Sequence, residues 1–241
     1  MAQLPQVRYR EYEGLTYQEA WDLQTACHNE LKSNKLAWRA LPEQERLLKR
    51  QVHNLIFCEH GHVYTLGKSG SKDHLLITDQ DLKKEKIEFH KINRGGDITY
   101  HGPGQLTGYP ILDMDEFYSD IHRYVRMLEE CIILLLAEYG IAGDRIEDYT
   151  GVWIKASKDD QPHRKVCAIG VHLSRWVTMH GFALNVNTDL SYFNRIIPCG
   201  IDDADKTVTS ISAELGKKVS MVEVKARLKS IFAAKFEFQY I

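Results

Sequence analysis

Two residues far apart in the sequence, Lys165 and Cys199, together have the chemistry required for acyl transfer. Cys199 lies between a proline and a glycine in a segment without helical or strand periodicity, and Lys165 precedes an apolar run. An ammonium group about 4 Å from a thiol could lower the thiol pKa by ~3 units, which would make the thiolate dominant at neutral pH. The thiolate would attack the acyl group and the lysine would move the protons. Without this context Lys165 is more typical of a strand end that reaches solvent, and most cysteines are structural.

A glycine-rich segment from Arg94 to Gln105 could supply backbone N–H groups to the oxyanion of such a reaction. It holds four glycines in twelve residues, together with the cation of Arg94 and the imidazole of His101. It matches neither a Walker A motif nor a dinucleotide-binding fingerprint, because no lysine–serine pair follows and no helix opens after it. The segment is therefore not predicted to bind a nucleotide. Two tight turns around a strand, with Arg94 in a structural salt bridge, are the alternative.

Cys58, His60 and His62 recur at every second position, a spacing that would bring three potential zinc ligands to one face of a strand. The turn expected at Gly61 interrupts that strand, and the spacing shows no fourth ligand. We therefore predict no metal site.

The composition is that of an ordinary globular protein of 241 residues, with a formal net charge of −2 and 44% hydrophobic residues. We expect a single catalytic domain over residues 1–241, and no nucleic-acid binding through a global basic field. The longest apolar run, 131–137, is too short to cross a membrane, and the N-terminal residues lack the features of a secretion signal. A cytoplasmic protein is expected, with five cysteines that are thiols and not disulfides.

Three long segments are predicted to be helices, with Thr16 and Ser220 as N-caps of the first and third and Gly140 closing the second. They span about 17–34, 119–139 and 221–235. Shorter runs predict a helical turn over 79–84 and strands over 54–58, 62–66, 87–92, 98–100, 106–112, 152–154, 165–173 and 176–186. The first two strands would form a hairpin. The order of elements predicts an α+β fold, with a mixed, mostly antiparallel sheet flanked by helices.

Several stretches of the sequence match, in the same order, the motifs of one enzyme family. They are Tyr17–Trp21, Glu59–Gly67, Arg94–Leu106, Lys165, Ala168–Gly170, His180–Asn185 and Pro198–Gly200. On these residues the chain resembles the lipoyl(octanoyl) transferases, which move an octanoyl group from acyl carrier protein to a lysine of a lipoyl domain. The resemblance covers nearly the whole chain. It implies the fold shared with lipoate and biotin protein ligases, with Glu59–Gly67 as the first hairpin.

The resemblance also implies roles for individual residues. Cys199 would carry the acyl thioester and Lys165 would lower its pKa. The residues that would bind the acyl substrate are Arg94, Gly95, Gly96, Asp97, Ile98, Thr99, Tyr100, His101, Ala168, Ile169, Gly170, Gly181, Phe182 and Ala183. We add Leu184 as a candidate wall. The polar loop 155–164 and Cys167 depart from the family pattern.

The partners implied by the resemblance are octanoyl-acyl carrier protein as donor and lipoyl domains as acceptors. These acceptors would be domains of 2-oxoacid dehydrogenase E2 subunits and the glycine cleavage H protein. The reaction would be the first step of lipoate attachment. Transfer from a thioester to an amide is downhill, so no cofactor and no ATP are expected.

Other assignments remain open from the residues. His172 or His180 could replace Lys165 as the base of a cysteine–histidine pair. A cysteine hydrolase could use His101 or His180 and release free acid. An ATP-dependent lipoate or biotin ligase of related fold would need no thiol, and a non-catalytic module that binds lipoyl domains would tolerate the loss of Cys199.

Overall fold

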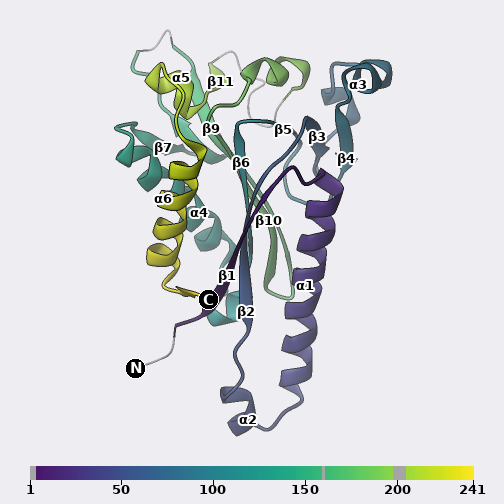
Figure 1. Ribbon diagram of the computed structural model, residues 1–241, viewed down its shortest axis with the longest axis vertical. Coiled ribbons are helices and arrows are strands. Elements are labelled where there is room, and N and C mark those ends of the chain that lie inside the picture. Colours follow the sequence, from purple (N-terminus) through teal and green to yellow (C-terminus); the bar gives the residue numbers. More distant parts are fainter. Residues whose placement is uncertain (1–3, 159–160, 198–204) are drawn as a thin grey trace.

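The structure, a computed structural model, describes residues 4–158, 161–197 and 205–241. These residues form two sheets (Figure 1). The larger has the order β12-β1-β2-β6-β10-β9-β8-β7, with β11 added to β9, and the smaller has the order β4-β3-β5. The strands of the larger sheet are β1 (Gln6–Glu13), β2 (Val52–Glu59), β6 (Gln105–Ile111), β7 (Gly143–Ile146), β8 (Tyr149–Ile154), β9 (His163–Ser174), β10 (Val177–Asn185), β11 (Lys206–Val208) and β12 (Gln239–Tyr240). Those of the smaller sheet are β3 (Val63–Leu66), β4 (Glu88–Lys91) and β5 (Ile98–His101).

The pairing within these sheets is mixed. From β2 across β6, β10, β9 and β8 to β7 every neighbouring pair is antiparallel, whereas β1 runs parallel to both β2 and β12, and β11 runs parallel to β9. The predicted α+β fold with a mixed, mostly antiparallel sheet is confirmed.

Local signals in the sequence account for the three long helices. Thr16 and Glu19 form a capping box at the start of α1 (Tyr17–Arg39), and the side chain of Ser220 caps α6 (Met221–Phe236), as predicted. Gly140, with φ +73°, follows the end of α4 (Ile121–Glu138). The shorter helices are α2 (Glu43–Leu47), α3 (Asp79–Glu85), α5 (Ile211–Leu215) and the 3₁₀ turns η1 (Lys72–His74), η2 (Met114–Glu116) and η3 (Leu190–Arg195).

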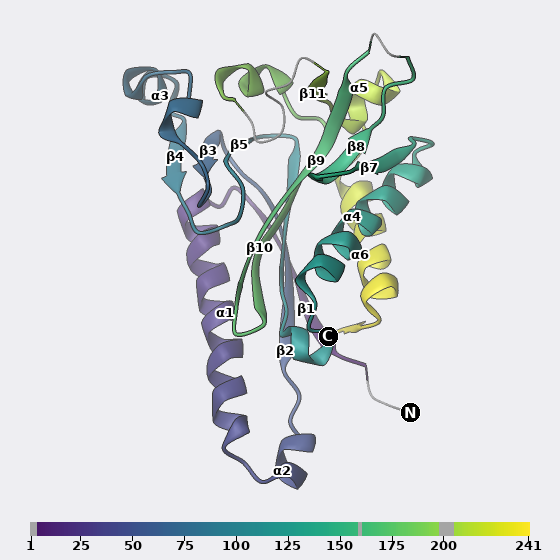
Figure 2. The ribbon, with the colours of Figure 1, turned by 180° about the vertical axis from the view of Figure 1, so that it is seen from behind.

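Helices cover both faces of the larger sheet (Figure 2). On one face α1 packs through Ala20, Cys27 and Leu31 against β2, β6 and β10. On the other face the apolar sides of α4 and α6 pack against each other and the sheet, in a core that includes Leu128 and Phe232. Within the described part of the chain, no helix is both long and apolar enough to span a membrane.

The predicted hairpin between residues 54–58 and 62–66 is wrong. The two strands exist, but β2 pairs with β1 and β6 in the larger sheet, and β3 pairs with β4 and β5 in the smaller one. The imidazole of His60 is buried and hydrogen-bonded to the hydroxyl of Tyr109, at 2.7 Å, and to the carbonyl of Leu15. His60 is thereby held against the larger sheet, and the chain turns away after it and enters the second sheet.

Strands β1, β7, β11 and β12 were not predicted, and the physical reason differs between the two longest of them, β1 and β7. Val7 is fully buried in β1, but the segment carries Arg8, Arg10 and Glu11 and lies near the edge of the sheet. Its apolar signal is therefore weak. The four residues of β7 form the outermost strand at the opposite edge, where little burial is required.

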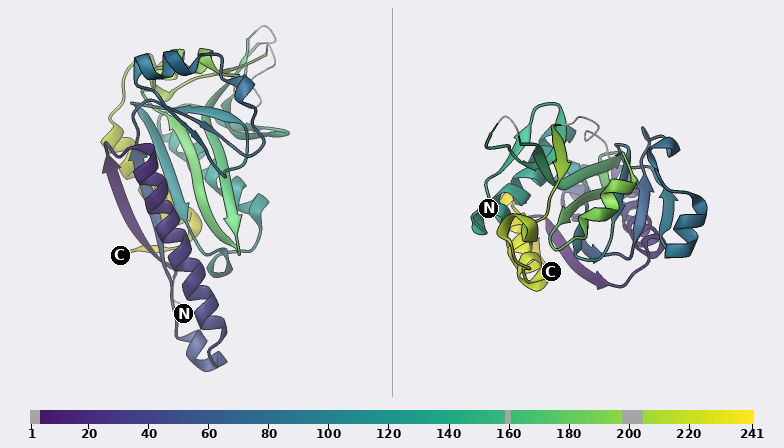
Figure 3. Two further views of the ribbon diagram at one scale, coloured as in Figure 1. Left: turned by 90° about the vertical axis from the view of Figure 1, so that its right-hand side faces the viewer. Right: turned by 90° about the horizontal axis from the view of Figure 1, so that it is seen from above.

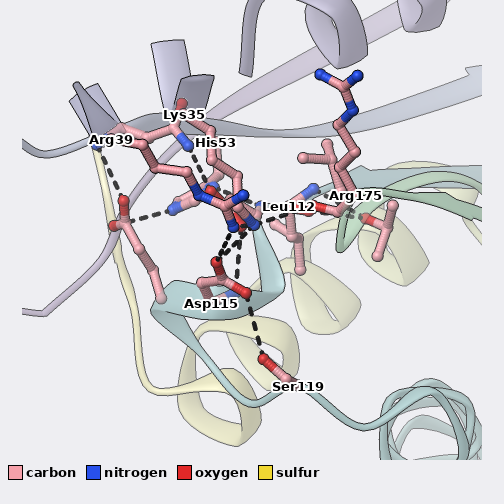
Figure 4. A network of polar contacts seen from close by, with 12 residues as sticks. Lys35, Arg39, His53, Leu112, Asp115, Ser119 and Arg175 are labelled. Carbon is pink, nitrogen blue, oxygen red and sulfur yellow. Dashed lines mark hydrogen bonds and ion pairs between the residues drawn. The ribbon is translucent and has the colours of Figure 1, made fainter. Parts of the chain in front are cut away.

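A buried ion-pair network holds the far end of α1, which runs past the end of the sheet before α2 (Figure 3, left). The ammonium of Lys35, 7% exposed, lies 2.6 Å from a carboxylate oxygen of Asp113 and 2.7 Å from Asp115, and donates to the carbonyl of Arg175. Gln51 donates to the second oxygen of Asp113. The side chains converge where α1, η2 and the β9–β10 turn meet (Figure 4).

Lys35→Met should destabilise the fold by about 3–5 kcal/mol, because it leaves the buried Asp113 carboxylate without its cation. Arg39→Met is the matched control. The Arg39 side chain is 60% exposed and lies 3.7 Å from Asp115, so its loss should cost less than about 1 kcal/mol. Urea unfolding of both variants measures the difference, and equal losses would show that the network does not hold the end of α1.

Candidate active site

A cavity of about 350 Å³ lies where the smaller sheet meets strands β9 and β10. The smaller sheet lies beside the N-terminal end of α1 (Figure 1), and Tyr17, the first residue of α1, also borders the cavity. Every residue predicted to bind the acyl substrate lines this cavity except Tyr100. A cavity of this size is typical of a small-molecule site.

Tyr100 lies on the other side of β5. Its ring stacks on Tyr192 at 4.8 Å between centroids, and its hydroxyl is 2.7 Å from Nδ1 of His62. It therefore contributes to the core of the smaller sheet. Leu184 was also expected to be a wall of the slot, but it is fully buried in the main core with α4 and α6 and is not among the residues lining the cavity.

Small residues make room for the cavity along β9 and β10. Ala168 pairs with Ala183 and Gly170 pairs with Gly181, so the two strands present small residues at adjacent positions. A Cβ atom on Gly170 would lie 2.9 Å from the carbonyl oxygen of Gly95. The glycine therefore allows the 94–97 loop to approach β9 closely.

The 94–97 loop is fixed by hydrogen bonds to both sheets. The backbone N–H of Gly95 donates to the carbonyl of Val171 in β9, at 3.0 Å. The guanidinium of Arg94 donates to the carbonyl and hydroxyl oxygens of Thr65 in β3, at 2.7 and 3.1 Å. One carboxylate oxygen of Asp97 accepts from the backbone of Ile98, and the other contacts His74. Hydrogen bonds thus hold this part of the glycine-rich segment over β9.

Lys165 reaches the cavity because the β8–β9 register shifts beside it. Val152 pairs with Cys167, but the next residue, Trp153, pairs with Lys165. One extra residue of β9 is inserted there, so Lys165 and Cys167 point to opposite faces instead of the same face. Cys167 is fully buried in the core, whereas Lys165 lines the cavity with its ammonium 4.5 Å from the centre of the Trp153 ring.

A second ammonium group lies close to this end of the cavity. Nζ of Lys206 is 4.5 Å from the centre of the Tyr149 ring, and Tyr149 lines the cavity. Lys206 was not identified from the sequence, and nothing in its local pattern distinguishes it from a surface lysine.

A series of hydrogen-bonded, buried polar groups lines one side of the cavity and joins the two sheets. Nδ1–H of His101 donates to Gln105, whose amide donates to Asn185, whose amide in turn donates to the carbonyl of Thr209. The backbone of Thr209 donates to the carbonyl of Lys165. Because Gln105 must present its oxygen to His101, this ring carries its proton on Nδ1. This series of hydrogen bonds therefore extends from β5 to β9, the strand that carries Lys165.

Burial keeps three histidines around this series of hydrogen bonds neutral. It lowers the pKa of His101 and of His180 to about 3 and that of His60 to about 4. His180 lines the cavity, and its Nε2 is 2.7 Å from Oδ1 of Asn93. Of the histidines considered as alternative bases, His101 and His180 therefore stay uncharged at neutral pH. Burial also lowers the pKa of His172, which lies outside this cavity.

The four cysteines that the structure describes are free thiols, as predicted, and all four are buried. Burial raises the pKa of Cys58 to about 12 and that of Cys167 further. Cys199, the predicted nucleophile, lies outside the described residues. On either side of segment 198–204, Phe193 and Val208 both line the cavity.

The possible zinc ligands Cys58, His60 and His62 do not converge. Cys58 packs under α1, His60 bonds to Tyr109, and His62 stacks on Tyr192 in the smaller sheet. Among the described residues, no group of three His, Cys, Asp or Glu side chains could hold a metal ion.

Several residues that line the cavity were not predicted to bind substrate. They are Tyr17, Gln105, Tyr109, Val125, Asp148, Tyr149, Thr150, Val171, His180, Asn185, Phe193 and Val208. Tyr17, Gln105, His180 and Asn185 lie within the family motifs and could have been found there. The others come from segments whose sequence gives no signal of proximity to the site.

The neutral histidines predict that the free energy of unfolding decreases in mild acid. The folded state keeps His60, His101 and His180 unprotonated below pH 6.5, whereas the unfolded chain takes up protons there, so each histidine should cost about 1.4 kcal/mol by pH 5.5. His60→Gln should reduce the loss between pH 7.5 and 5.5 by about this amount. Urea unfolding at both pH values tests this, and an unchanged loss in the variant would contradict it.

Comparison with known proteins identifies the family. Residues 16–233 match the lipoyl protein ligase A/B catalytic domain. The chain is 56% identical over 223 residues to an octanoyltransferase from Cytophaga hutchinsonii, covering 92% of this chain and 89% of that protein. It is 50% identical over 228 residues to an octanoyltransferase from Christiangramia forsetii, covering 92% and 94%.

Solved structures of ligases share the fold. A bipartite lipoate protein ligase from Thermoplasma acidophilum superposes with a TM-score of 0.69 at 17% identity, over 98% of this chain and 86% of that one. A lipoate-protein ligase A bound with ATP gives 0.66 at 16% identity, over 99% and 87%. At these identities the similarity concerns the fold, whereas the octanoyltransferases match in sequence along most of their length. The chain therefore belongs to the octanoyltransferases, within the lipoyl protein ligase A/B catalytic domain family.

Proposed function

We propose that the chain transfers an octanoyl group from a carrier-protein thioester to Cys199 and then to a lysine of a lipoyl domain. The observation that supports this most is the position of Lys165, whose side chain borders one end of a cavity with small and apolar walls. The segment that carries Cys199 is flanked by residues of the same cavity, Phe193 and Val208. We further infer that residues 1–241 act as one catalytic unit.

The proposed reaction has two steps. The Cys199 thiolate attacks the octanoyl carbonyl, a new C–S bond forms, and the carrier thiolate leaves and takes a proton from the Lys165 ammonium. The amine of the acceptor lysine then attacks this thioester, an amide forms, and the Cys199 thiolate leaves. Neutral Lys165 takes up the proton that the amine loses, which restores the starting state.

The acyl chain would lie along β9 and β10, over the small residues Ala168, Gly170 and Ala183, with Ile169 and Phe182 among the walls. Each buried methylene contributes ~0.8 kcal/mol, so an eight-carbon chain can supply several kcal/mol of binding. The predicted substrate-binding residues of the 94–101 segment would hold the chain from the opposite side.

The proposed donor is octanoyl-acyl carrier protein. The proposed acceptors are lipoyl domains such as those of 2-oxoacid dehydrogenase E2 subunits and the glycine cleavage H protein. The archaeal ligase of similar fold was solved as part of a lipoylation system with its E2 lipoyl domain, which supports an acceptor of this kind. No cofactor is required, because a thioester already carries an activated acyl group.

Intact mass after incubation with octanoyl carrier protein tests the nucleophile. The protein should gain one octanoyl group that hydroxylamine removes, Cys199→Ala should gain none, and Cys27→Ala, which removes a buried thiol of α1, should behave like the parent. Acylation of Cys199→Ala would show that the nucleophile is misassigned. Product formation from free octanoate only with ATP would favour the ligase mechanism instead.

Lys165→Ala should raise the pKa of Cys199, measured from the pH dependence of its alkylation, by at least about one unit toward the ordinary value near 8.5. Lys206→Ala is the matched control, because it removes the other ammonium close to the cavity, and should produce a smaller rise. If the two variants shift the pKa equally, or neither does, Lys165 has no specific role in activating the thiol.

A further inference from the structure

Backbone hydrogen bonds join the chain just before Cys199 to the segment that follows β3. Residues 74–76 and 195–197 lie antiparallel and are connected by two hydrogen bonds of 2.8 Å. In one of them the N–H of Ile197 donates to the carbonyl of His74. Ile197 is two residues from Cys199 in the sequence. A displacement of His74 would therefore also displace the start of the segment that carries the proposed nucleophile.

The side chain of His74 contacts the loop that borders the cavity. Its Nδ1 contacts one carboxylate oxygen of Asp97, and the other oxygen accepts from the N–H of Ile98 at 2.7 Å. A carboxylate has only acceptors, so the His74 ring donates from Nδ1. Gly70 packs against the same carboxylate, and a Cβ atom there would collide with it. The side chain of Asp97 is 13% exposed and lines the cavity.

His74 thus connects two parts of the proposed site through a single residue. Its carbonyl binds the chain that leads to Cys199, and its imidazole binds the loop that would hold the acyl group. The ring itself is 35% exposed and is not among the residues lining the cavity. It can therefore influence the reaction only through the groups that it positions, and a misplacement of about 1 Å between reacting groups can cost about 100-fold in rate.

We propose that His74 is a positioning residue, which uses its bond to Asp97 to hold the Cys199 segment in register with the acyl-binding loop. This inference rests on the proposed function, in which Cys199 attacks an acyl group held beside the 94–97 loop. It assigns no proton transfer to His74. What matters is a donor at the position of Nδ1, because that atom makes the contact with the carboxylate.

His74→Leu and His74→Asn form a matched pair for the test. Leucine removes the donor to Asp97, whereas the side-chain N–H of asparagine lies close to the position of the imidazole Nδ1. In single-turnover acylation by octanoyl carrier protein, His74→Leu should lower the maximal rate by about ten- to 100-fold, with little change in the half-saturating donor concentration. His74→Asn should stay within about three-fold of the parent, because it keeps a hydrogen bond to the carboxylate.

Lys72→Met is the control from the same turn. It removes the exposed ion pair with Asp79, 3.2 Å long, and leaves the contact between His74 and Asp97 in place. The acylation rate should not change. Alkylation of Cys199 by iodoacetamide, above the pKa of the thiol, needs no bound acyl group. All the variants should therefore react within about two-fold of the parent in that assay, which separates a misplaced thiol from a damaged one.

The effect should also pass through Asp97. The double variant His74→Leu/Asp97→Ala should be no slower than Asp97→Ala alone, and additive losses would contradict the proposal. Equal losses in the leucine and asparagine variants would show that the imidazole itself is needed. An unchanged rate in a folded His74→Leu protein would likewise overturn the positioning role while leaving the proposed function intact. If the parent is not acylated at Cys199, the proposed function is wrong and the role of His74 is refuted with it.

Discussion

The close approach of the 94–97 loop to strand β9 is the constraint on which the site depends. It joins the smaller sheet to the larger one through the bond from Gly95 to the carbonyl of Val171. Gly170 makes the approach possible, since a Cβ atom there would collide with the Gly95 carbonyl. This contact places the 94–97 loop over β9, so that its residues line the cavity together with those of β9 and β10.

The polar side chains buried around this largely apolar cavity must have hydrogen-bond partners, because an unpaired buried polar group would destabilise the fold. His101, Gln105, Asn185 and Thr209 are hydrogen-bonded to one another in series. Burying their polar atoms therefore costs little stability. Burial keeps His101 and His180 neutral, whereas Lys165 brings an ammonium group to the part of the cavity where the chemistry is proposed.

Much of the fold could be predicted from the sequence because its signals are local. Thr16 and Ser220 cap their helices through hydrogen bonds within one turn, and the long strands β9 and β10 have apolar runs that need no partner to be recognised. The predicted hairpin failed because pairing is not local. His60 binds to Tyr109, far along the chain, and that contact separates β2 from β3. The charged strand β1 acquires its place only from neighbours on both sides.

The sequence by itself determined the family, the positions of the long helices and about half of the residues that line the cavity, because long motifs keep their order whatever the tertiary structure. It could not determine which way individual side chains point. Alternation along a strand assumes a regular backbone, and β9 and β10 each break that rule once. The register shift beside Val152 turns Lys165 away from the core that holds Cys167. The left-handed residue His180 is turned toward Asn93. Both irregularities are stabilised by contacts with distant segments, so only the tertiary structure decided them.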